Sequence, residues 1–370
     1  MLFNIFIANH GKLGGVEDFI SILQNIIQKR GYQVEVSEEL NPNAINVLID
    51  EFTNSYTNLM ITEFKSTHPN AVLIYVLTEF IEKRLLVRSF NFFGNILDAS
   101  VIAVLNVYIR LHRQDFNKPT IWHWVLAIVY FPLFPVFYLS RYIKKKKKVA
   151  MLKIIHSLAY MLMRYMGLER MLPYADGVVI SHNSINLDSD KVPVLGVIYP
   201  EFDYADIERK IFGQKILGVE VTGSITSYRH RVINKVNSSI MQQGLKKYFN
   251  VCQIIAFSSS KKDVPRAAFS IHPPQTKHWK YSSPTRIYRA LQFDHNMPIL
   301  TKVFNQHPIE KLCLVFNSSL LLDMIKFYKH PKMALDFLQP RVQEYNRIAK
   351  LENDEMVNAM IALAKQRLAR

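Results

Sequence analysis

The chain has 370 residues, more than the roughly 100 to 200 of one domain, so its length predicts two domains. Hydrophobic residues make up 49% of the sequence, which supports well-formed cores, and the formal net charge of +16 favours an acidic partner. Cys252 and Cys313 lie in apolar runs without metal-ligand spacing, which excludes a disulfide framework and indicates reduced core residues in a cytoplasmic protein. Met1–Ala8 is strand-like and lacks a basic leader, so no signal peptide is expected.

The first eighty residues alternate apolar β-type runs with helical patterns. Phe3–Ala8 predicts the first strand, Val16–Arg30 a helix that ends at a glycine, and Gln33–Val36 the second strand. Ile45–Ile49 and Val72–Leu77 add two more strands. This alternation predicts a parallel sheet covered by helices.

Strand patterns return in the second half of the chain, after a long helical and aromatic stretch. The predicted strands are Gly177–Ile180, Val194–Ile198, Gly218–Val221, Val251–Phe257, Ala267–Ile271 and Met297–Leu300. Helices are expected from about Ser319 to Arg370. The fold class is therefore α/β with two Rossmann-like domains. We expect an N-terminal domain at 1–205 with a helical insertion at 80–170, a C-terminal domain at 206–345, and a C-terminal helix at 346–370.

An apolar segment inside the insertion predicts contact with a membrane. Trp122–Tyr142 reaches the ~20 residues that span a bilayer, but Pro132 and Pro135 break the helix and aromatics run throughout it. We therefore expect a bent hairpin or amphipathic insertion in one leaflet; a buried core helix followed by a solvated loop is the alternative. The expected membrane residues are Trp122, Trp124, Tyr130 and Tyr138 at the interface, and Lys144, Lys145, Lys146, Lys147 and Lys148 on anionic headgroups.

A Pro-rich, cationic turn after the run Ala267–Ile271 predicts a phosphate site. The turn opens into an amphipathic helix at Ser282 or Ser283, where Ser283 is a favoured N-cap and Pro284 takes the first helical position. The amides of the first turn are then left to meet an anion. The cationic residues around this turn are Lys277, His278, Lys280, Arg286 and Arg289.

A second turn, Val221–Arg231, has the same character. The strand ends at Gly223, and a helix begins near Ser227 with Arg229 and Arg231 in its first turns. Turns at the carboxyl ends of parallel strands converge, so both turns are expected at one diphosphate. The alternative is that Ser227 only caps a helix whose arginines face solvent.

A third turn follows the first strand and contains Gly11, Gly14 and Gly15. The spacing is not GxGxxG, which disfavours a nicotinamide site. The turn instead offers close backbone approach to a ligand, with His10 nearby.

Three motifs resemble glycosyltransferases of the GT-B fold: GGVE at Gly14–Glu17, GSITSYRHR at Gly223–Arg231, and the SSPTRIYRAL, MPILTK and HPIE string within Ser282–Glu310. The last two look like a bacterial group of sugar-nucleotide transferases that build surface polysaccharides or glycolipids. The resemblance implies that the second domain holds the nucleotide sugar and the first holds the acceptor. It also implies that the donor diphosphate meets Gly223, Ser224, Arg229, Ser282, Ser283 and Arg286. Many retaining members carry a glutamate pair at the donor-binding helix, whereas Tyr288 and Arg289 stand where the second acid is expected, so the stereochemical course stays open.

The transfer needs a base for the acceptor hydroxyl, and the candidates are Glu79, after the fourth predicted strand, and His10. Other candidates to line the cleft are Gly14, Gly15, Lys277, His272 and His307; the last also fits an ordinary helix start. Helix termini and arginines stabilise the leaving diphosphate, so neither a metal nor a cofactor is expected.

The sequence thus predicts a peripheral transferase on the inner face of the plasma membrane. Its expected partners are a nucleotide sugar, a lipid-linked or glycan acceptor and an anionic membrane surface, and no nucleic acid. Two alternatives stay open: a non-catalytic GT-B-like protein that binds membranes and other proteins, and a basic nucleic-acid binder, which charge alone suggests.

Overall fold

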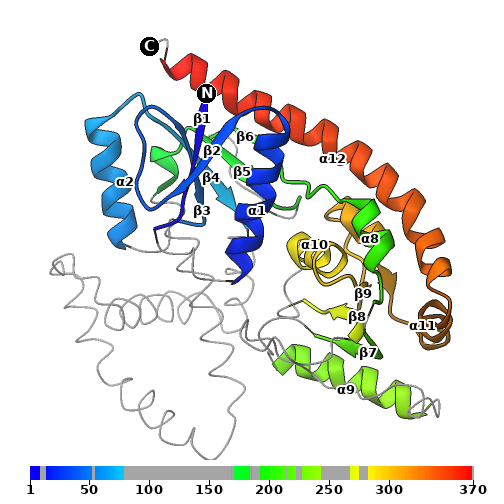
Figure 1. The fold of residues 1–370 in the computed structure, drawn as a ribbon. Coiled ribbons are helices and arrows are strands. Elements are labelled where there is room, and N and C mark those ends of the chain that lie inside the picture. Colours follow the sequence, from blue (N-terminus) through cyan, green and yellow to red (C-terminus); the bar gives the residue numbers. More distant parts are fainter. Residues whose placement is uncertain are drawn as a thin grey trace, which may run out of the picture. The chain divides into compact units, whose positions relative to one another are not determined.

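The computed structural model describes residues 1–8, 14–51, 55–78, 168, 171–183, 185, 192–213, 215–221, 227–242, 267–274, 282–317 and 319–368. Two parallel sheets account for the strands in these ranges (Figure 1). Both sheets belong to one compact unit, which comprises Met1–Asp50, His68–Phe80 and Ala175–Arg370. A second unit contains α2 (Ser55–Thr67) and η2 (Leu172–Tyr174), which contact each other.

The first sheet has the order β2-β1-β3-β4-β5-β6 with all neighbours parallel. Its strands are β1 (Leu2–Phe6), β2 (Gln33–Ser37), β3 (Ile45–Ile49), β4 (Val72–Leu77), β5 (Gly177–Ile180) and β6 (Val194–Val197). Every residue of β3, β4 and β5 is buried, as expected where a parallel sheet is covered on both faces. Helix α1 (Gly14–Lys29) follows β1, and Gly31, two residues after its last residue, has a positive φ of 78° that suits the turn after a helix.

The second sheet has the order β10-β9-β8-β7 and is also parallel (Figure 1). Its strands are β7 (Ile216–Glu220), β8 (Ala267–His272), β9 (Met297–Leu300) and β10 (Leu314–Val315). The helical elements of this half are α8 (Tyr204–Lys210), α9 (Ser227–Gln242), α10 (Pro284–Gln292), η4 (Pro308–Leu312) and α11 (Leu320–Lys329).

These two sheets confirm the prediction of two Rossmann-like halves, the architecture that the GT-B resemblance implies. The predicted strand Val251–Phe257 and the predicted insertion at 80–170, apart from Leu168, lie outside the described residues. No helix within the described ranges is both long and apolar enough to cross a bilayer. The boundary expected at 345/346 falls inside one helix, α12 (Pro331–Leu368), because the chain continues as a helix through Pro340.

The long helix α12 contacts β4, β5 and β6 of the first sheet and η4, α8 and α11 of the second half. Its buried stripe repeats after eleven residues, at Ala334, Tyr345 and Met356. Such a repeat corresponds to about 3.67 residues per turn, so the stripe stays on one face of the helix. Gly196 lets β6 approach this stripe, since a Cβ there would lie 2.8 Å from the Cβ of Met356.

Two asparagines of α12 bind the segment that leaves the first sheet. Asn353 accepts a hydrogen bond from the amide of Tyr199 at 3.2 Å and donates one to its carbonyl oxygen at 2.7 Å. Asn346 does the same for Phe202, at 2.9 and 2.8 Å. Both side chains pair with extended backbone as a neighbouring strand would. The segment 198–203 is thereby fixed to α12.

We predict that Asn353→Ala destabilises the fold by about 1–3 kcal/mol, because the variant leaves the buried amide and carbonyl of Tyr199 without partners. Urea denaturation measures the change in the free energy of unfolding. Asn358→Ala is the matched control, since Asn358 is exposed on the same helix and alanine favours helices. Equal stability of the two variants would contradict a structural role for this pairing.

Candidate functional site

The carboxyl ends of β7 and β8 lie at the same edge of the second sheet, because the two strands are parallel. Helices α9 and α10 begin after these strands, so their N-terminal turns are directed to this edge (Figure 1). This is the arrangement that the two predicted phosphate turns require.

Arg229 connects the two turns. It lies in the first turn of α9, its side chain is only 1% exposed, and its Nε donates to the carbonyl oxygen of Pro273, just after β8, at 3.3 Å. A buried guanidinium from one turn thus contacts the backbone of the other. The alternative that the arginines of this turn face solvent is wrong for Arg229, whereas Arg231 is exposed. Gly223 and Ser224 of the same turn lie outside the described residues.

The start of α10 differs in one detail from the prediction. Ser283 occupies the N-cap position and Pro284 follows it, but the Ser283 hydroxyl forms no capping bond and instead pairs with Thr285 Oγ1 at 3.0 Å. The side chain therefore does not occupy the first-turn amides. Ser282 is buried, and its hydroxyl has no hydrogen-bond partner among the described residues. Arg286 lies half-buried in the first turn of α10.

His272 ends β8 at this edge of the sheet. Its Nε2 lies 2.8 Å from Ser270 Oγ, whereas its Nδ1 has no partner within the described ranges. Burial lowers the pKa of His272 to about 4, so the imidazole is neutral at pH 7. Nδ1 of His272 and the Ser282 hydroxyl are thus two buried polar atoms for which the described residues provide no hydrogen-bond partner.

His307 and Glu310 of the HPIE motif serve the local structure. His307 caps η4: its Nδ1 accepts from the amide of Ile309 at 3.2 Å, and its Nε2 lies 3.2 Å from the carbonyl oxygen of Ile198. Both ring nitrogens are engaged, so His307 makes the ordinary helix start that the motif also predicted. Burial lowers the pKa of His307 to about 4. The Glu310 carboxylate accepts from the backbone amides of residues 304–306 at 2.7, 3.1 and 3.4 Å.

An acidic residue that the sequence did not single out lies against α10. Asp18 of α1 accepts from Arg289 Nη1 at 2.8 Å. Tyr288, at the other position where an acid was sought, is a core residue packed on Phe202 and Phe293. The acid next to this helix therefore comes from α1. The signal in the sequence was the aspartate that directly follows GGVE.

The carboxyl ends of β3, β4 and β5 form a second polar cluster, in the first sheet. Asp50 is buried with a positive φ of 53°, and its carboxylate accepts from the amide of Thr78 at 3.2 Å and from the Thr78 hydroxyl. Ser181 donates to the carbonyl oxygen of Thr78 at 3.1 Å. These bonds fix the residue that immediately precedes Glu79.

Several predicted residues lie outside the described part of the chain, and their roles stay predictions. They are His10, Glu79, Lys277 and the membrane residues Trp122, Trp124, Tyr130, Tyr138 and Lys144–Lys148. Gly14 and Gly15 are the first two residues of α1.

No protein-family model and no curated protein sequence matches the chain. Among solved structures, the chain is similar to the apo form of the lipopolysaccharide outer core galactosyltransferase WaaB, with a TM-score of 0.36 and 8% identity over 98% of this chain and 99% of that one. It is also similar to α,α-trehalose 6-phosphate synthase from Burkholderia multivorans, with a TM-score of 0.37 and 10% identity over 96% of this chain and 84% of that one. No function follows from likenesses this distant.

The Asp18–Arg289 pair gives a prediction on pH. Burial raises the pKa of Asp18 above 3.8 by more than Arg289 lowers it. The folded state therefore holds this proton more tightly than the unfolded state, so stability from Asp18 is present below pH 3.8 and is lost as pH rises through the folded pKa. Asp18→Asn should gain stability relative to the wild type over this interval, by about 1.4 kcal/mol per unit of raised pKa.

Urea denaturation from pH 3.5 to pH 7 tests this expectation. Asp323→Asn is the control, because Asp323 forms a solvent-exposed pair with Lys326 on α11 and should differ little from the wild type. If the wild type gains stability over Asp18→Asn as pH rises, the arginine outweighs burial and the assignment is wrong.

Proposed function

We propose that the protein is a glycosyltransferase that moves a sugar from a nucleotide-sugar donor to a lipid-linked or surface-glycan acceptor. The contact between Arg229 and Pro273 is the observation that supports it most, since it unites two turns suited to phosphate at one edge of the second sheet. A phosphate bound there would meet the N-terminal turn of α10 and the guanidinium group of Arg286. Such a site suits the phosphate of a sugar nucleotide.

In the proposed reaction, the bond between the anomeric carbon and the donor phosphate oxygen breaks while the acceptor hydroxyl bonds to that carbon. The hydroxyl proton passes to a base, for which Glu79 and His10 are the proposed residues. The negative charge that develops on the leaving phosphate is stabilised by Arg229, Arg286 and the helix N-termini, so the step needs no metal. The bonds among Asp50, Thr78 and Ser181 support this proposal because they fix the residue before Glu79.

We also propose that Trp122–Lys148 holds the enzyme in one leaflet at the cytoplasmic face of the membrane, where a lipid-linked acceptor is within reach. The apolar length of the segment, its two prolines and the adjoining lysines support this proposal.

We predict that one class of nucleotide sugar raises the melting temperature of the wild-type protein, and that Arg229→Lys and Arg286→Ala bind it 10- to 100-fold more weakly. This decrease in affinity corresponds to the loss of one charged hydrogen bond, which is worth about 1.5–3 kcal/mol. Thermal shift with UDP, GDP, CMP and ADP sugars measures the effect. Arg347→Ala is the control, as Arg347 is an exposed arginine of α12 that pairs with Glu344. Without stabilisation by any nucleotide sugar, the proposal fails and a non-catalytic protein remains.

For the membrane segment, we predict that deletion of Trp122–Lys148 moves the protein from membranes to the soluble fraction. Replacing Lys144–Lys148 by glutamine should weaken binding to anionic vesicles by about 1 kcal/mol per lysine and leave weak binding to neutral vesicles unchanged. Flotation on phosphatidylserine and phosphatidylcholine vesicles separates the two contributions. An unchanged distribution of the deletion variant between membrane and soluble fractions would refute the proposed anchor.

A further inference from the structure

A chain of buried polar side chains crosses the core of the second sheet and ends at His272. It runs from Glu220 of β7 to Asn296, which precedes β9, then to Ser270 and His272 of β8. Glu220, Asn296 and Ser270 are at most 1% exposed. Buried polar groups are costly unless they are hydrogen-bonded, so the direction of each bond in the chain is constrained.

Glu220 sets the direction at one end. Its Oε1 accepts from Asn296 Nδ2 at 2.7 Å and its Oε2 accepts from the amide of Ala267 at 3.3 Å. With Glu220 ionised, its carboxylate only accepts hydrogen bonds, so the NH₂ group of Asn296 faces Glu220. The amide oxygen of Asn296 is then turned to Ser270.

Ser270 transmits this direction to the imidazole. Its hydroxyl has a single hydrogen, which it donates to Asn296 Oδ1 at 2.9 Å. The contact of 2.8 Å between Ser270 Oγ and His272 Nε2 must therefore have the histidine as donor. In the neutral imidazole the hydrogen is on Nε2, and Nδ1 presents a lone pair.

Within this series of hydrogen-bonded side chains, His272 Nδ1 is the atom that the described residues leave without a partner. His272 is nevertheless only 5% exposed. A buried acceptor left unpaired costs about 1–3 kcal/mol, so its presence in a native structure calls for a partner from elsewhere. The residue after His272 is Pro273, whose carbonyl oxygen accepts from Arg229. His272 thus directly precedes the residue that Arg229 contacts at the proposed phosphate site.

We propose that Glu220, Asn296 and Ser270 are positioning residues that hold His272 as the Nε2–H tautomer, so that Nδ1 accepts a hydrogen bond from a hydroxyl group of the bound nucleotide sugar. This inference rests on the proposed function for the identity of the ligand. The tautomer itself depends only on protein groups, with Glu220 as the ionised end of the series. Glu220 acts through two intervening side chains and does not touch the donor.

The first experiment determines the tautomer without ligand. In protein labelled with ¹⁵N-histidine, the couplings between ring nitrogens and carbon-bound protons distinguish Nε2–H from Nδ1–H, and His272→Gln assigns the signals. We expect the Nε2–H form at pH 7 in the wild type. In Glu220→Gln the new amide can also donate, so Asn296 can turn round and Ser270 can donate to Nε2, and the Nδ1–H form should appear.

Glu35→Gln is a matched control, because Glu35 of β2 also accepts from an asparagine side chain, Asn41 Nδ2, at 3.0 Å. This variant should leave the His272 signals unchanged. An Nδ1–H tautomer in the wild type overturns the inference. So does an unchanged tautomer in a folded Glu220→Gln variant.

The second experiment links the chain to the ligand. Titration with the nucleotide sugar that stabilises the wild type should shift the Nδ1 signal of His272, and Ser270→Ala should bind that donor about tenfold more weakly while Glu35→Gln binds it normally. If no nucleotide sugar binds the wild type, the proposed function fails while the tautomer result stands. If the donor binds but leaves Nδ1 unshifted, or binds Ser270→Ala as tightly as the wild type, this inference fails and the proposed function stands.

Discussion

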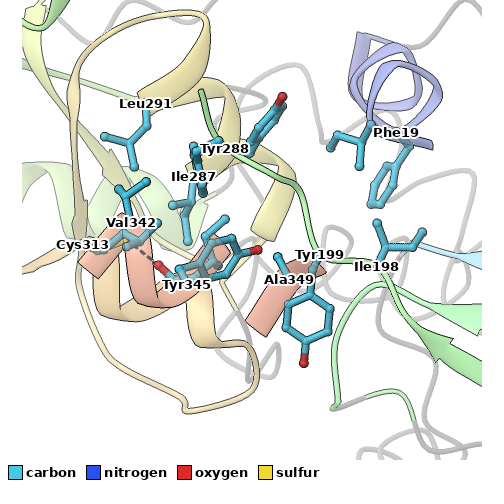
Figure 2. Close-up of a cluster of buried hydrophobic side chains, with 14 of the residues drawn as sticks. Phe19, Ile198, Tyr199, Ile287, Tyr288, Leu291, Cys313, Val342, Tyr345 and Ala349 are labelled. Carbon is cyan, nitrogen blue, oxygen red and sulfur yellow. Dashed lines mark hydrogen bonds between the residues drawn. The ribbon is translucent and has the colours of Figure 1, made fainter. Parts of the chain in front are cut away.

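The pairing of α12 with the segment 198–203 is the constraint on which much of the structure depends. This segment joins the two sheets, and its extended backbone would have buried polar groups without partners if Asn353 and Asn346 did not bind Tyr199 and Phe202. Apolar packing follows from that placement. Phe202 contacts Tyr288 and Tyr345, with ring centroids 5.2 and 5.4 Å apart, and Figure 2 shows Tyr199 and Tyr345 within the same buried cluster.

The same segment fixes α1 through Glu201. Burial favours a raised pKa for Glu201, but hydrogen bonds from Lys29 and Asn353 and the charges of Lys29 and Arg30 lower it overall. Arg30 also pairs with Asp354 of α12 at 2.7 Å. The C-terminal end of α1 thus forms ion pairs with the segment 198–203 and with α12. Near the start of α1, Asp18 pairs with Arg289 of α10. Both ends of the helix that follows the first glycine turn are held against elements of the second half.

Strands β1 to β9 were predictable from short, mostly apolar runs, and their observed ends differ from the predicted ones by at most a few residues. The two-residue strand β10 was not predicted, because so short a run has no period to detect. The partly buried ion pair between Asp18 and Arg289 and the hydrogen-bonded series from Glu220 to His272 were not predictable. Arg289 and Asp18 are 271 residues apart in sequence, and Asn296 and Glu220 are 76 apart. No local pattern relates such residues; only the fold brings them together. His307 shows the converse: the motif HPIE fits both a ligand contact and a helix cap, and only the bonds to Ile309 and Ile198 establish the cap.

The two kinds of polar group at the candidate site differ in what they can select. Arginines and helix N-termini attract any phosphate, and every nucleotide sugar carries one, so these groups supply affinity without distinguishing donors. A single lone pair in a fixed direction is different, since a ligand without a hydroxyl at that point would leave Nδ1 buried and unpaired. The core of the second sheet contains a buried carboxylate and two further polar side chains behind this one atom. Such an arrangement is hard to explain by stability, because apolar residues of similar size would fill the same space at less cost. It has a physical reason if the direction of the His272 lone pair decides which sugar nucleotide the site accepts.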